Sequence, residues 1–443
     1  MAKKKQIELT IEEKLQNALV PKEEQPYKIP SNWCWTYIHN IAIVVTGKTP
    51  SKKNKEYYGG KFPFFKPADL DAGRNMQYAT EYLSEKGKSI SVIIPEKATG
   101  ICCIGTIGKC GYFLVEGTTN QQINTVISKI NPLYSYYFFN TNSFVRELIS
   151  KASATTIAIV NKSKLESCLF PVAPLNEQQR IVNRIESLFV KLDRAKELIE
   201  NTLAQFEQNK MAILHKAFTG ELTVKWRKEN NIDLSSWKKC ELKEVFKVVK
   251  DKYNPQTENQ IVNYIGLENI ETSKGIISKS NSSEVKSIKT KFKKDDVLYG
   301  KLRPYLNKHD VVNFDGICST DILVFRFNDI NTAKYINYYF NLPMFIQYAV
   351  ENSSGINLPR VSEKTISKYK ISLPTIEEQQ EIVNILDNLL AKYNKIKNLE
   401  QQLEKIELLK KAILAKVFRG ELGTNNPDEE SAENLLKEIL AEK

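Results

Sequence analysis

The sequence predicts an α+β protein in which two globular domains are joined by two long helices that pack on each other as an antiparallel coiled coil. A stretch at residues 212–222 returns at residues 412–422, and in both places it ends a long heptad pattern of apolar residues. A β-rich block of domain size precedes each pattern. Two such halves predict an internal repeat with a pseudo-two-fold axis.

The two helical patterns are close copies. The repeated stretch reads Ala-Ile-Leu-His-Lys-Ala-Phe-Thr-Gly-Glu-Leu in the first copy and Ala-Ile-Leu-Ala-Lys-Val-Phe-Arg-Gly-Glu-Leu in the second. A Glu-Gln-Gln triplet at 177–179 returns at 378–380, so the offset changes from 200 to 201 residues. Apolar residues at alternating steps of three and four form a coiled-coil seam in each copy. One short step, from Ile396 to Leu399, marks the place of the lost residue.

Each helix is expected to begin after a proline, Pro174 or Pro374, and to end at a left-handed C-terminal glycine, Gly220 or Gly420. The first helix would be about 60 Å long, which is too long for the core of a small domain. A single helix would leave its apolar seam in water, so we expect the two copies to pack together. Because a whole domain lies between them, they can run antiparallel. The pair would then hold two dissimilar domains at a fixed separation.

These patterns predict the boundaries of six segments. We expect an N-terminal arm with a short helix at 1–30, a first globular domain at 31–175, a first spacer helix at 176–222, a linker and second globular domain at 223–374, a second spacer helix at 375–422 and an acidic C-terminal tail at 423–443. Thr10 and Glu13 have the spacing of a capping box, and Pro21 must end the helix of the arm. That helix is too short to be stable alone, so it should dock on another element.

The two globular blocks share an outline. Short apolar bursts alternate with Gly, Lys and Asn turns, as in β-strands. Trp33 opens the first block and Trp237 opens the second. One helix is expected at 133–149, and a matching helix is expected at 333–350.

Composition and the distribution of charge narrow the class of protein. The 443 residues, 42% of them hydrophobic, suit two to four domains with ordinary cores. A net charge of +12 attracts polyanions, nucleic acid first, although a solvated Lys-rich surface would have the same composition. Lys and Arg are concentrated in residues 238–308, which favours the nucleic-acid interpretation.

The start lacks the apolar region of a secretory signal, and the apolar runs are too short to span a bilayer, so a cytoplasmic location is expected. The seven cysteines form no Cys-x-x-Cys pair and are expected in the core, reduced.

Several motifs recur in a fixed order along the chain. Both helices carry Glu-Gln-Gln and Phe-x-Gly-Glu-Leu, and acidic residues follow at 427–433. The globular blocks add Gly-Lys-Thr-Pro at 47–50, Gly-Lys-Leu-Arg-Pro-Tyr-Leu-Asn-Lys at 300–308 and Gly-Ile-Asn-Leu-Pro-Arg at 355–360. In these motifs, and over essentially its whole length, the chain resembles the specificity subunits of type I restriction-modification enzymes. The first block departs from the pattern, because Gly-Thr-Ile-Gly-Lys at 105–109 replaces the fuller Gly-x-x-Arg-Pro-Tyr run.

The resemblance implies a non-catalytic subunit with two target-recognition domains, each of which reads one half of a bipartite site in double-stranded DNA. The family's conserved helices would set the gap between the halves and dock two modification subunits. Those subunits would bind S-adenosylmethionine and methylate adenine at N6. Restriction subunits, which combine a motor and a nuclease and need ATP and Mg²⁺, would then join. The chain itself would bind no cofactor and no metal.

Two alternatives remain at this point. The first is a self-contained DNA methyltransferase or restriction enzyme. Against it, Asn131-Pro132-Leu133-Tyr134 lacks the second proline of an amino-methyltransferase loop. Thr46-Gly47-Lys48-Thr49 is not a phosphate loop, because Ala42 stands where that motif needs glycine. The second alternative is a coiled-coil adaptor that binds only proteins, for which the +12 charge would be incidental.

A DNA-binding surface needs cations on phosphates and Arg, Lys, Asn or Gln at base edges. Residues of these types on expected loops are the DNA-binding candidates, with a solvated surface role as the alternative for each: Lys48, Lys52, Lys53, Lys66, Asp69, Arg74, Lys109, Asn120, Gln121, Gln122, Lys301, Arg303, Tyr305, Asn307, Lys308 and Arg360. The helix motifs supply the candidates for contacts with a partner subunit or within the coiled coil: Glu177, Gln178, Gln179, Leu188, Leu192, Phe206, Phe218, Gly220, Glu221, Leu222, Glu378, Gln379, Gln380, Leu389, Tyr393, Leu403, Phe418, Gly420, Glu421 and Leu422.

Overall fold

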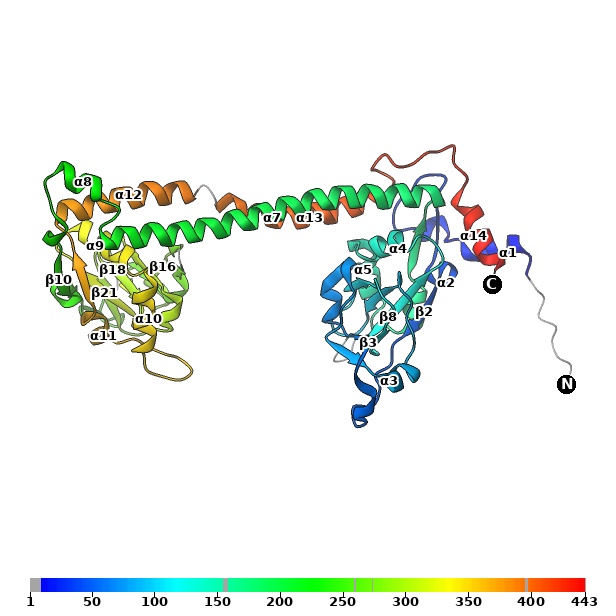
Figure 1. Ribbon diagram of the computed structural model, residues 1–443, viewed down its shortest axis with the longest axis horizontal. Coiled ribbons are helices and arrows are strands. Elements are labelled where there is room, and N and C mark those ends of the chain that lie inside the picture. Colours follow the sequence, from blue (N-terminus) through cyan, green and yellow to red (C-terminus); the bar gives the residue numbers. More distant parts are fainter. Residues whose placement is uncertain (1–8, 154–157, 259, 273, 395–396, 443) are drawn as a thin grey trace. The chain divides into compact units, whose positions relative to one another are not determined.

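The structure is a computed structural model that describes residues 9–153, 158–258, 260–272, 274–394 and 397–442 (Figure 1). The chain divides into two compact units. Unit 1 comprises residues 1–198 and 401–443, and unit 2 comprises residues 199–400. The long helix α7, Leu175–Thr219, contributes residues to both units. No helix in the described ranges is long and apolar enough to cross a membrane.

Unit 1 is built on two sheets. The first is antiparallel, with the order β2-β8-β5-β6, and the second has the order β4-β3-β7, in which β3 and β7 run parallel. A separate antiparallel pair, β1 with β9, joins the beginning of the domain to its end. The strands are β1 Cys34–Tyr37, β2 Ala42–Thr46, β3 Tyr58–Phe65, β4 Glu81–Leu83, β5 Thr99–Cys102, β6 Cys110–Tyr112, β7 Thr118–Thr119, β8 Ile123–Ser128 and β9 Leu169–Val172.

Unit 2 repeats part of this topology. Its antiparallel sheet β11-β21-β18-β19 matches β2-β8-β5-β6 strand for strand, and the pair β10 with β22 matches β1 with β9. Its other sheet, β12-β17-β20-β13-β16, contains one parallel pair, β13 with β20, as unit 1 pairs β3 with β7. The strands of this domain are β10 Lys238–Glu241, β11 Lys247–Val248, β12 Lys252–Tyr253, β13 Asn263–Ile265, β14 Ile270–Glu271, β15 Gly275–Ile276, β16 Ser280–Asn281, β17 Lys289–Phe292, β18 Val297–Gly300, β19 His309–Val311, β20 Gly316–Cys318, β21 Ile322–Arg326 and β22 Lys370–Leu373.

The single helix expected in each globular block is wrong, because both blocks have two shorter helices there. In unit 1, Thr141 caps the second helix by accepting a hydrogen bond from Phe144 N at 3.3 Å. In unit 2, Pro343 occupies the first turn of the second helix, where its missing N–H leaves no bond unmade. The shorter helices of the two domains are α2 Ile38–Ile41, α3 Glu85–Ser89, α4 Pro132–Phe139, α5 Asn142–Ser150, α6 Lys162–Glu166, α8 Val224–Glu229, α9 Ile330–Tyr339, α10 Pro343–Glu351 and α11 Glu363–Ser367.

Within each unit the two helical copies run antiparallel, as predicted. The second copy is described as two helices, α12 Ile376–Asn394 and α13 Lys397–Val417. In unit 1, Lys410 bonds Asp193 at 2.5 Å and Lys196 bonds Glu407 at 3.2 Å. Residue numbers therefore rise along α7 in the direction in which they fall along α13. In unit 2, Leu214 near the end of α7 shares a core with residues near the start of α12, and Figure 1 draws these segments side by side. The expected place of the lost residue includes Ile396, which lies outside the described residues.

Both helical copies end as the sequence predicts. Gly220 and Gly420 have φ values of 81° and 75°, in the left-handed region that favours glycine. The aromatic residue two positions earlier enters the core of the adjacent domain. Phe418 packs 5.1 Å from Tyr134 in unit 1, and Phe218 packs 5.0 Å from Tyr335 in unit 2, measured between ring centroids. The motif therefore anchors each helix end in a globular domain.

The N-terminal arm docks on the C-terminal tail, both in unit 1. Helix α1, Ile11–Ala18, has the predicted capping box between Thr10 and Glu13. It packs against α14, Ala432–Ala441, which Figure 1 draws beside it. Leu436 of α14 and Leu15 of α1 are buried in the main core of unit 1. The arm thus has the partner that its short length requires, and part of the acidic tail is a packed helix.

Candidate nucleic-acid interface

In unit 2 the loop at 301–308, here called the basic loop, connects β18 to β19. The side chains of Arg303 and Tyr305 are exposed on it, Tyr305 to 53%. The backbone N–H of Arg303 donates to Pro359 O at 2.7 Å, which ties the loop to residues 354–360. Within 354–360, Arg360 is exposed, and its Nε lies 3.3 Å from Asp321, which is 4.0 Å from Lys301 Nζ. The structure therefore brings Lys301, Arg303, Tyr305 and Arg360 together at one place.

The backbone of the basic loop is strained at two residues. Arg303 and Asn307 have φ values of 52° and 42°, a region that costs a residue other than glycine about 1–3 kcal/mol. At the corresponding turn of unit 1 the same region is occupied by Gly105 and Gly108, with φ values of 82° and 87°. Unit 2 thus has an arginine at a left-handed position where unit 1 has a glycine.

Isolated bridges fix this correspondence between the two domains. Ile104 pairs with Ile159 in unit 1, as Leu302 pairs with Arg360 in unit 2. The residue after each bridge is Gly105 or Arg303, so Arg303 has a glycine as its counterpart. Lys109 directly precedes β6, as Lys308 directly precedes β19. The match of Lys109 is therefore Lys308.

Two of the candidates in the basic loop support it from inside. Asn307 is 7% exposed, and its Nδ2 donates to Phe340 O and to His309 Nε2, both at 3.0 Å. His309 Nδ1 lies 2.7 Å from Asn337 Oδ1, so this pattern fits a neutral imidazole with its proton on Nδ1. Lys308 Nζ donates to Leu267 O at 2.7 Å. These contacts hold the strained turn in place.

Acidification is expected to weaken this support. Burial lowers the pKa of His309 from 6.5 to about 4, because the imidazolium would lose its hydration. Above pH 6.5 the histidine is neutral in both states and costs nothing. Between pH 6.5 and 4 the unfolded chain binds the extra proton, so stability falls by on the order of 3 kcal/mol. Urea titrations of wild type and His309→Gln across this range measure the effect as their difference. Parallel pH profiles would contradict it.

In unit 1 the structure brings one group of candidates together beside a tight turn. The loop after β2 carries Lys48, Lys52 and Lys53, all exposed. Thr49 Oγ1 on this loop donates to Gln121 Oε1 at 2.5 Å. Gly47 is needed at the turn, because a Cβ there would lie 2.3 Å from the carbonyl oxygen of Asn120. Asn120 is buried and donates from Nδ2 to Gln122 Oε1 at 2.9 Å. Basic and amide side chains thus meet at this turn.

The other four candidates of unit 1 are engaged within the unit. Asp69 is 8% exposed and accepts hydrogen bonds from Lys66 N at 2.7 Å and Thr80 N at 2.9 Å, which closes a turn. The other three form ion pairs, Lys66 with Glu81 at 2.5 Å, Lys109 with Asp71 at 2.6 Å, and Arg74 with Glu186 of α7.

The glutamates of the Glu-Gln-Gln triplets are not interface residues. We expected Glu177 and Glu378 to face a partner or the opposite helix, but both are fully buried in their own units. Glu177 Oε2 accepts from Trp33 Nε1 at 2.8 Å, and Glu378 Oε2 accepts from Trp237 Nε1 at 2.8 Å. Each glutamate therefore joins a helix start to the tryptophan that opens the adjacent domain.

Each glutamate also binds the segment that follows the other helical copy. In unit 2, Thr223 Oγ1 donates to Glu378 Oε1 at 2.6 Å, and Arg227 Nη1 donates to the same oxygen at 2.5 Å. In unit 1, Asn425 Nδ2 donates to Glu177 Oε2 at 2.9 Å, and Thr424 lies 3.3 Å from Oε1. Sequence reasoning missed these partners, although the threonine shortly after each Gly-Glu-Leu was a usable signal.

The glutamines that follow are buried as well. Gln178 Oε1 accepts from Asn131 N at 3.0 Å, and its Nε2 donates to Ala173 O at 2.8 Å. Gln379 makes the matching bonds with Thr332 Oγ1 at 2.7 Å and Pro374 O at 2.8 Å. The expectation of an interface is therefore wrong for these two residues also.

The remaining candidates on the helices fall into three sets. Exposed residues are Gln179, Gln380, Glu221 and Glu421. Partly buried residues along the helices are Leu188, Leu192, Phe206, Leu389 and Leu403, whereas Phe218, Phe418, Leu222 and Leu422 pack on the domain cores. The side chain of Tyr393 lies outside the described ones.

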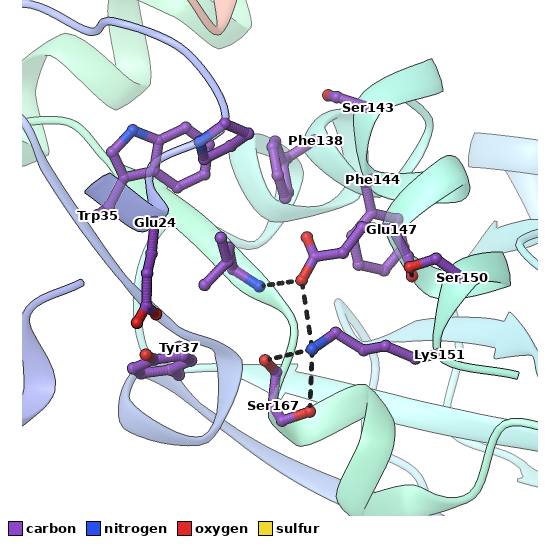
Figure 2. A pocket seen from close by; sticks show the side chains of 12 residues that line it. Glu24, Trp35, Tyr37, Phe138, Ser143, Phe144, Glu147, Ser150, Lys151 and Ser167 are labelled. Atoms are coloured by element: carbon purple, nitrogen blue, oxygen red, sulfur yellow. Dashed lines mark hydrogen bonds and ion pairs between the residues drawn. The ribbon is translucent and has the colours of Figure 1, made fainter. Parts of the chain in front are cut away.

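A pocket of about 330 Å³ lies in unit 1 beside β1 and α5 (Figure 2). Glu147 in its wall accepts a hydrogen bond from Leu169 N at 2.9 Å, and burial raises the pKa of its carboxyl. Lys151 donates to Ser167 O at 3.2 Å. These bonds fix the C-terminal end of α5 to residues 167–169, where α6 ends and β9 begins. Across the described ranges, no three His, Cys, Asp or Glu side chains are grouped so that they could hold a metal ion.

Comparison with known proteins places this geometry in a family. The protein-family model described as type I restriction modification DNA specificity domain matches residues 30–207 and 235–408 of the sequence. The type I restriction enzyme EcoDI specificity subunit of Escherichia coli is 24% identical, over 94% of this chain and 96% of that protein. The MjaIX specificity subunit of Methanocaldococcus jannaschii is 25% identical, over 90% of this chain and 96% of that protein.

Two solved structures share the fold. One, from work on complex assembly and conformational transition of the type I R-M system, has a TM-score of 0.68 at 17% identity and covers 90% of this chain and 100% of that chain. The HsdS subunit of Thermoanaerobacter tengcongensis has a TM-score of 0.54 at 18% identity, with the same coverage. The family matches span most of the chain and confirm the resemblance found in the sequence. The chain belongs to the family of type I restriction modification DNA specificity domains and carries two copies of the domain.

Proposed function

We propose that this chain is the DNA sequence-specificity subunit of a type I restriction-modification complex and that each of its two domains reads one half of a bipartite site. The repeat of topology carries the proposal. The four-stranded antiparallel sheets of the two units match strand for strand, while the loops differ, with Gly105 at the position where unit 2 has Arg303. A repeated scaffold with different loops suits a site whose halves differ in sequence.

The methyltransferase and nuclease activities would belong to partner subunits. Two modification subunits would supply S-adenosylmethionine and methylate adenine at N6, and restriction subunits would supply the ATP- and Mg²⁺-dependent steps in the cytoplasm. Exposed apolar side chains on the helices of unit 1 support a docking role. Val190 of α7 is 66% exposed, and Leu408 and Leu409 of α13 are 63% and 50% exposed. Apolar groups left in water on a helix pair favour contact with a protein partner.

Sequencing of methylated adenines tests the proposal directly. Cells that carry this gene with a modification-subunit gene should methylate adenines within one bipartite motif, and cells with either gene alone should not. Purified chain incubated with DNA and S-adenosylmethionine, or with DNA and Mg²⁺, should show no turnover. Methylation or cleavage by the chain alone would instead support a self-contained enzyme.

Removal of the Arg303 guanidinium should weaken DNA binding without loss of stability. Arg303→Gly is the sharpest variant, because glycine adopts the left-handed backbone without strain. A lost phosphate contact should lower affinity and reduce the salt slope by about one, and a lost base contact should cost about 1–3 kcal/mol. Affinity of the assembled complex, measured at several salt concentrations, gives both quantities. Unchanged affinity and slope would remove Arg303 from the interface and favour a protein-binding adaptor.

A shorter pair of helices should change the gap between half-sites but not the half-sites. Deletion of one heptad from α7 and one from the facing part of α13 keeps the apolar seam in register. The helices lose about 10 Å, roughly three base pairs of B-form DNA. Methylated motifs should therefore show a gap about three base pairs shorter. Alanines placed at exposed positions of the same heptads, without deletion, are the control. An unchanged gap with altered half-sites would contradict the spacer role.

A further inference from the structure

The segment Ser354–Arg360 of unit 2, here called the tip loop, carries the most exposed large apolar side chain among the described residues. Ile356 is 100% exposed, and Leu358 near it is 43% exposed. Aliphatic side chains of this size are usually among the most buried in a protein. Binding of phosphates would account for the exposed cations of the basic loop beside it. It would not account for an isoleucine left in water.

Backbone hydrogen bonds fix the base of the tip loop, and Ile356 projects from it into solvent. Ser354 and Arg360 exchange backbone hydrogen bonds of 2.9 and 2.8 Å across its base. Val361 N donates to Lys301 O at 3.0 Å, beside the bond from Arg303 N to Pro359 O. Gly355 has a φ of 104°, and a Cβ there would lie 3.0 Å from Leu358 O, so the turn itself is tight.

The groups around the tip indicate what covers it. Arg303 and Arg360 are exposed at its base, and Tyr305 is half exposed on the adjoining turn. Asp321 orients Arg360 through its Nε and leaves the other guanidinium nitrogens for a ligand. A surface of two arginines with one protruding aliphatic group is complementary to duplex DNA. The cations match the phosphates, and the apolar group matches the methyl and ring edges of bases in a groove.

We infer that Ile356 makes an apolar contact with base edges in the half-site that unit 2 reads, and so contributes to sequence choice. This inference rests on the proposed DNA-reading function. The contact removes an aliphatic side chain from water only when shape and base edges fit, which favours the cognate half-site. It carries no charge, so it adds nothing to the attraction for DNA of arbitrary sequence.

The test compares affinities of the assembled complex with its modification subunits for cognate and for arbitrary duplexes. Ile356→Ala should weaken cognate binding about tenfold or more, the loss expected for most of one buried aliphatic side chain. Affinity for arbitrary DNA and the salt slope should stay unchanged, in contrast to Arg303→Gly. Ile356→Val should retain most of the affinity.

Ile261→Ala is the matched control. Ile261 is 69% exposed in the same unit and lies just before β13. The opposite end of β13 is the one near Asp321, because Ile265 O there accepts a hydrogen bond from Ser319 N. This control should bind both duplexes like wild type. Equal thermal midpoints for the variants and wild type would show that folding is intact, as expected for a fully exposed side chain.

Duplexes with one scrambled half-site localise the effect. Ile356→Ala should lose the advantage given by one half-site only. A wild-type complex that distinguishes both halves, with Ile356→Ala equal to it, would overturn the inference and leave the proposed function intact. Equal losses at both halves would also overturn the inference. A wild-type complex that ignores both halves would instead contradict the proposed function.

Discussion

Glu378→Ala is expected to destabilise unit 2 by about 3–5 kcal/mol, because it leaves a buried cation without its counter-charge. Arg227 is 6% exposed, and its Nη1 lies 2.5 Å from Glu378 Oε1. The substitution also leaves Trp237 Nε1 and Thr223 Oγ1 without the acceptor they share. Unpaired buried donors cost more than the hydrogen bonds contributed, so these losses add to that of the charge.

Hydrogen exchange measured peptide by peptide is the suitable measurement, because it reports on the two units separately. Protection in unit 2 should fall sharply, while the domain of unit 1 keeps its protection. Glu377→Ala is the matched control, since Glu377 is the preceding residue of the same helix and is exposed. Equal effects from the two substitutions would mean that the buried pair contributes little to stability.

The long helices could be predicted because their signals are local. A heptad of apolar residues, a proline before the first turn and a glycine after the last determine a helix largely by themselves. The observed ends, Leu175–Thr219 and a left-handed Gly220, follow that pattern. Local signals were also present where the prediction failed. Thr141 and Pro343 each mark a new helix start, but the apolar period runs across both points and concealed them.

The roles of Glu177 and Glu378 could not be read from the sequence, because burial of a charge depends on residues far along the chain. The partners of Glu177 lie at Trp33 and Asn425, on opposite ends of the molecule's sequence. A charged residue at a helix start is ordinarily exposed, and only the assembled fold shows the donors that compensate its burial. The sequence shows the Glu-Gln-Gln motif correctly, but its glutamates lie inside the units and not on an interface.

The residue types of the candidate DNA surface could be predicted from the sequence, but the positions of their side chains could not. The sequence shows a basic run at 301–308, yet the strained backbone of Arg303 and the inward position of Asn307 depend on the paired strands β18 and β19. The same strands reveal that Lys109 corresponds to Lys308. Loop residues are therefore compared reliably between the two domains only after their sheets have been matched.

Leu436→Ala is expected to destabilise unit 1 by about 2–5 kcal/mol, the usual loss when a fully buried leucine is replaced by alanine. Leu436 of α14 is 0% exposed in the same core as Leu15 of α1. Helix α1 has eight residues, too few to be stable without a partner, so it should lose exchange protection together with α14. Unit 2 should keep its protection, and Glu438→Ala, an exposed change on the same helix, should have no effect.

Truncation before Ser431 extends the same argument, because it removes Ala432, Leu436, Ile439 and Leu440, all of them buried. The loss should exceed that of Leu436→Ala and should again appear first in α1. Protection of α1 that survives the truncation would show that the arm is held by the domain alone. Loss confined to α1 and its neighbours would show that the two ends of the chain stabilise each other, so that the acidic tail is structural in unit 1.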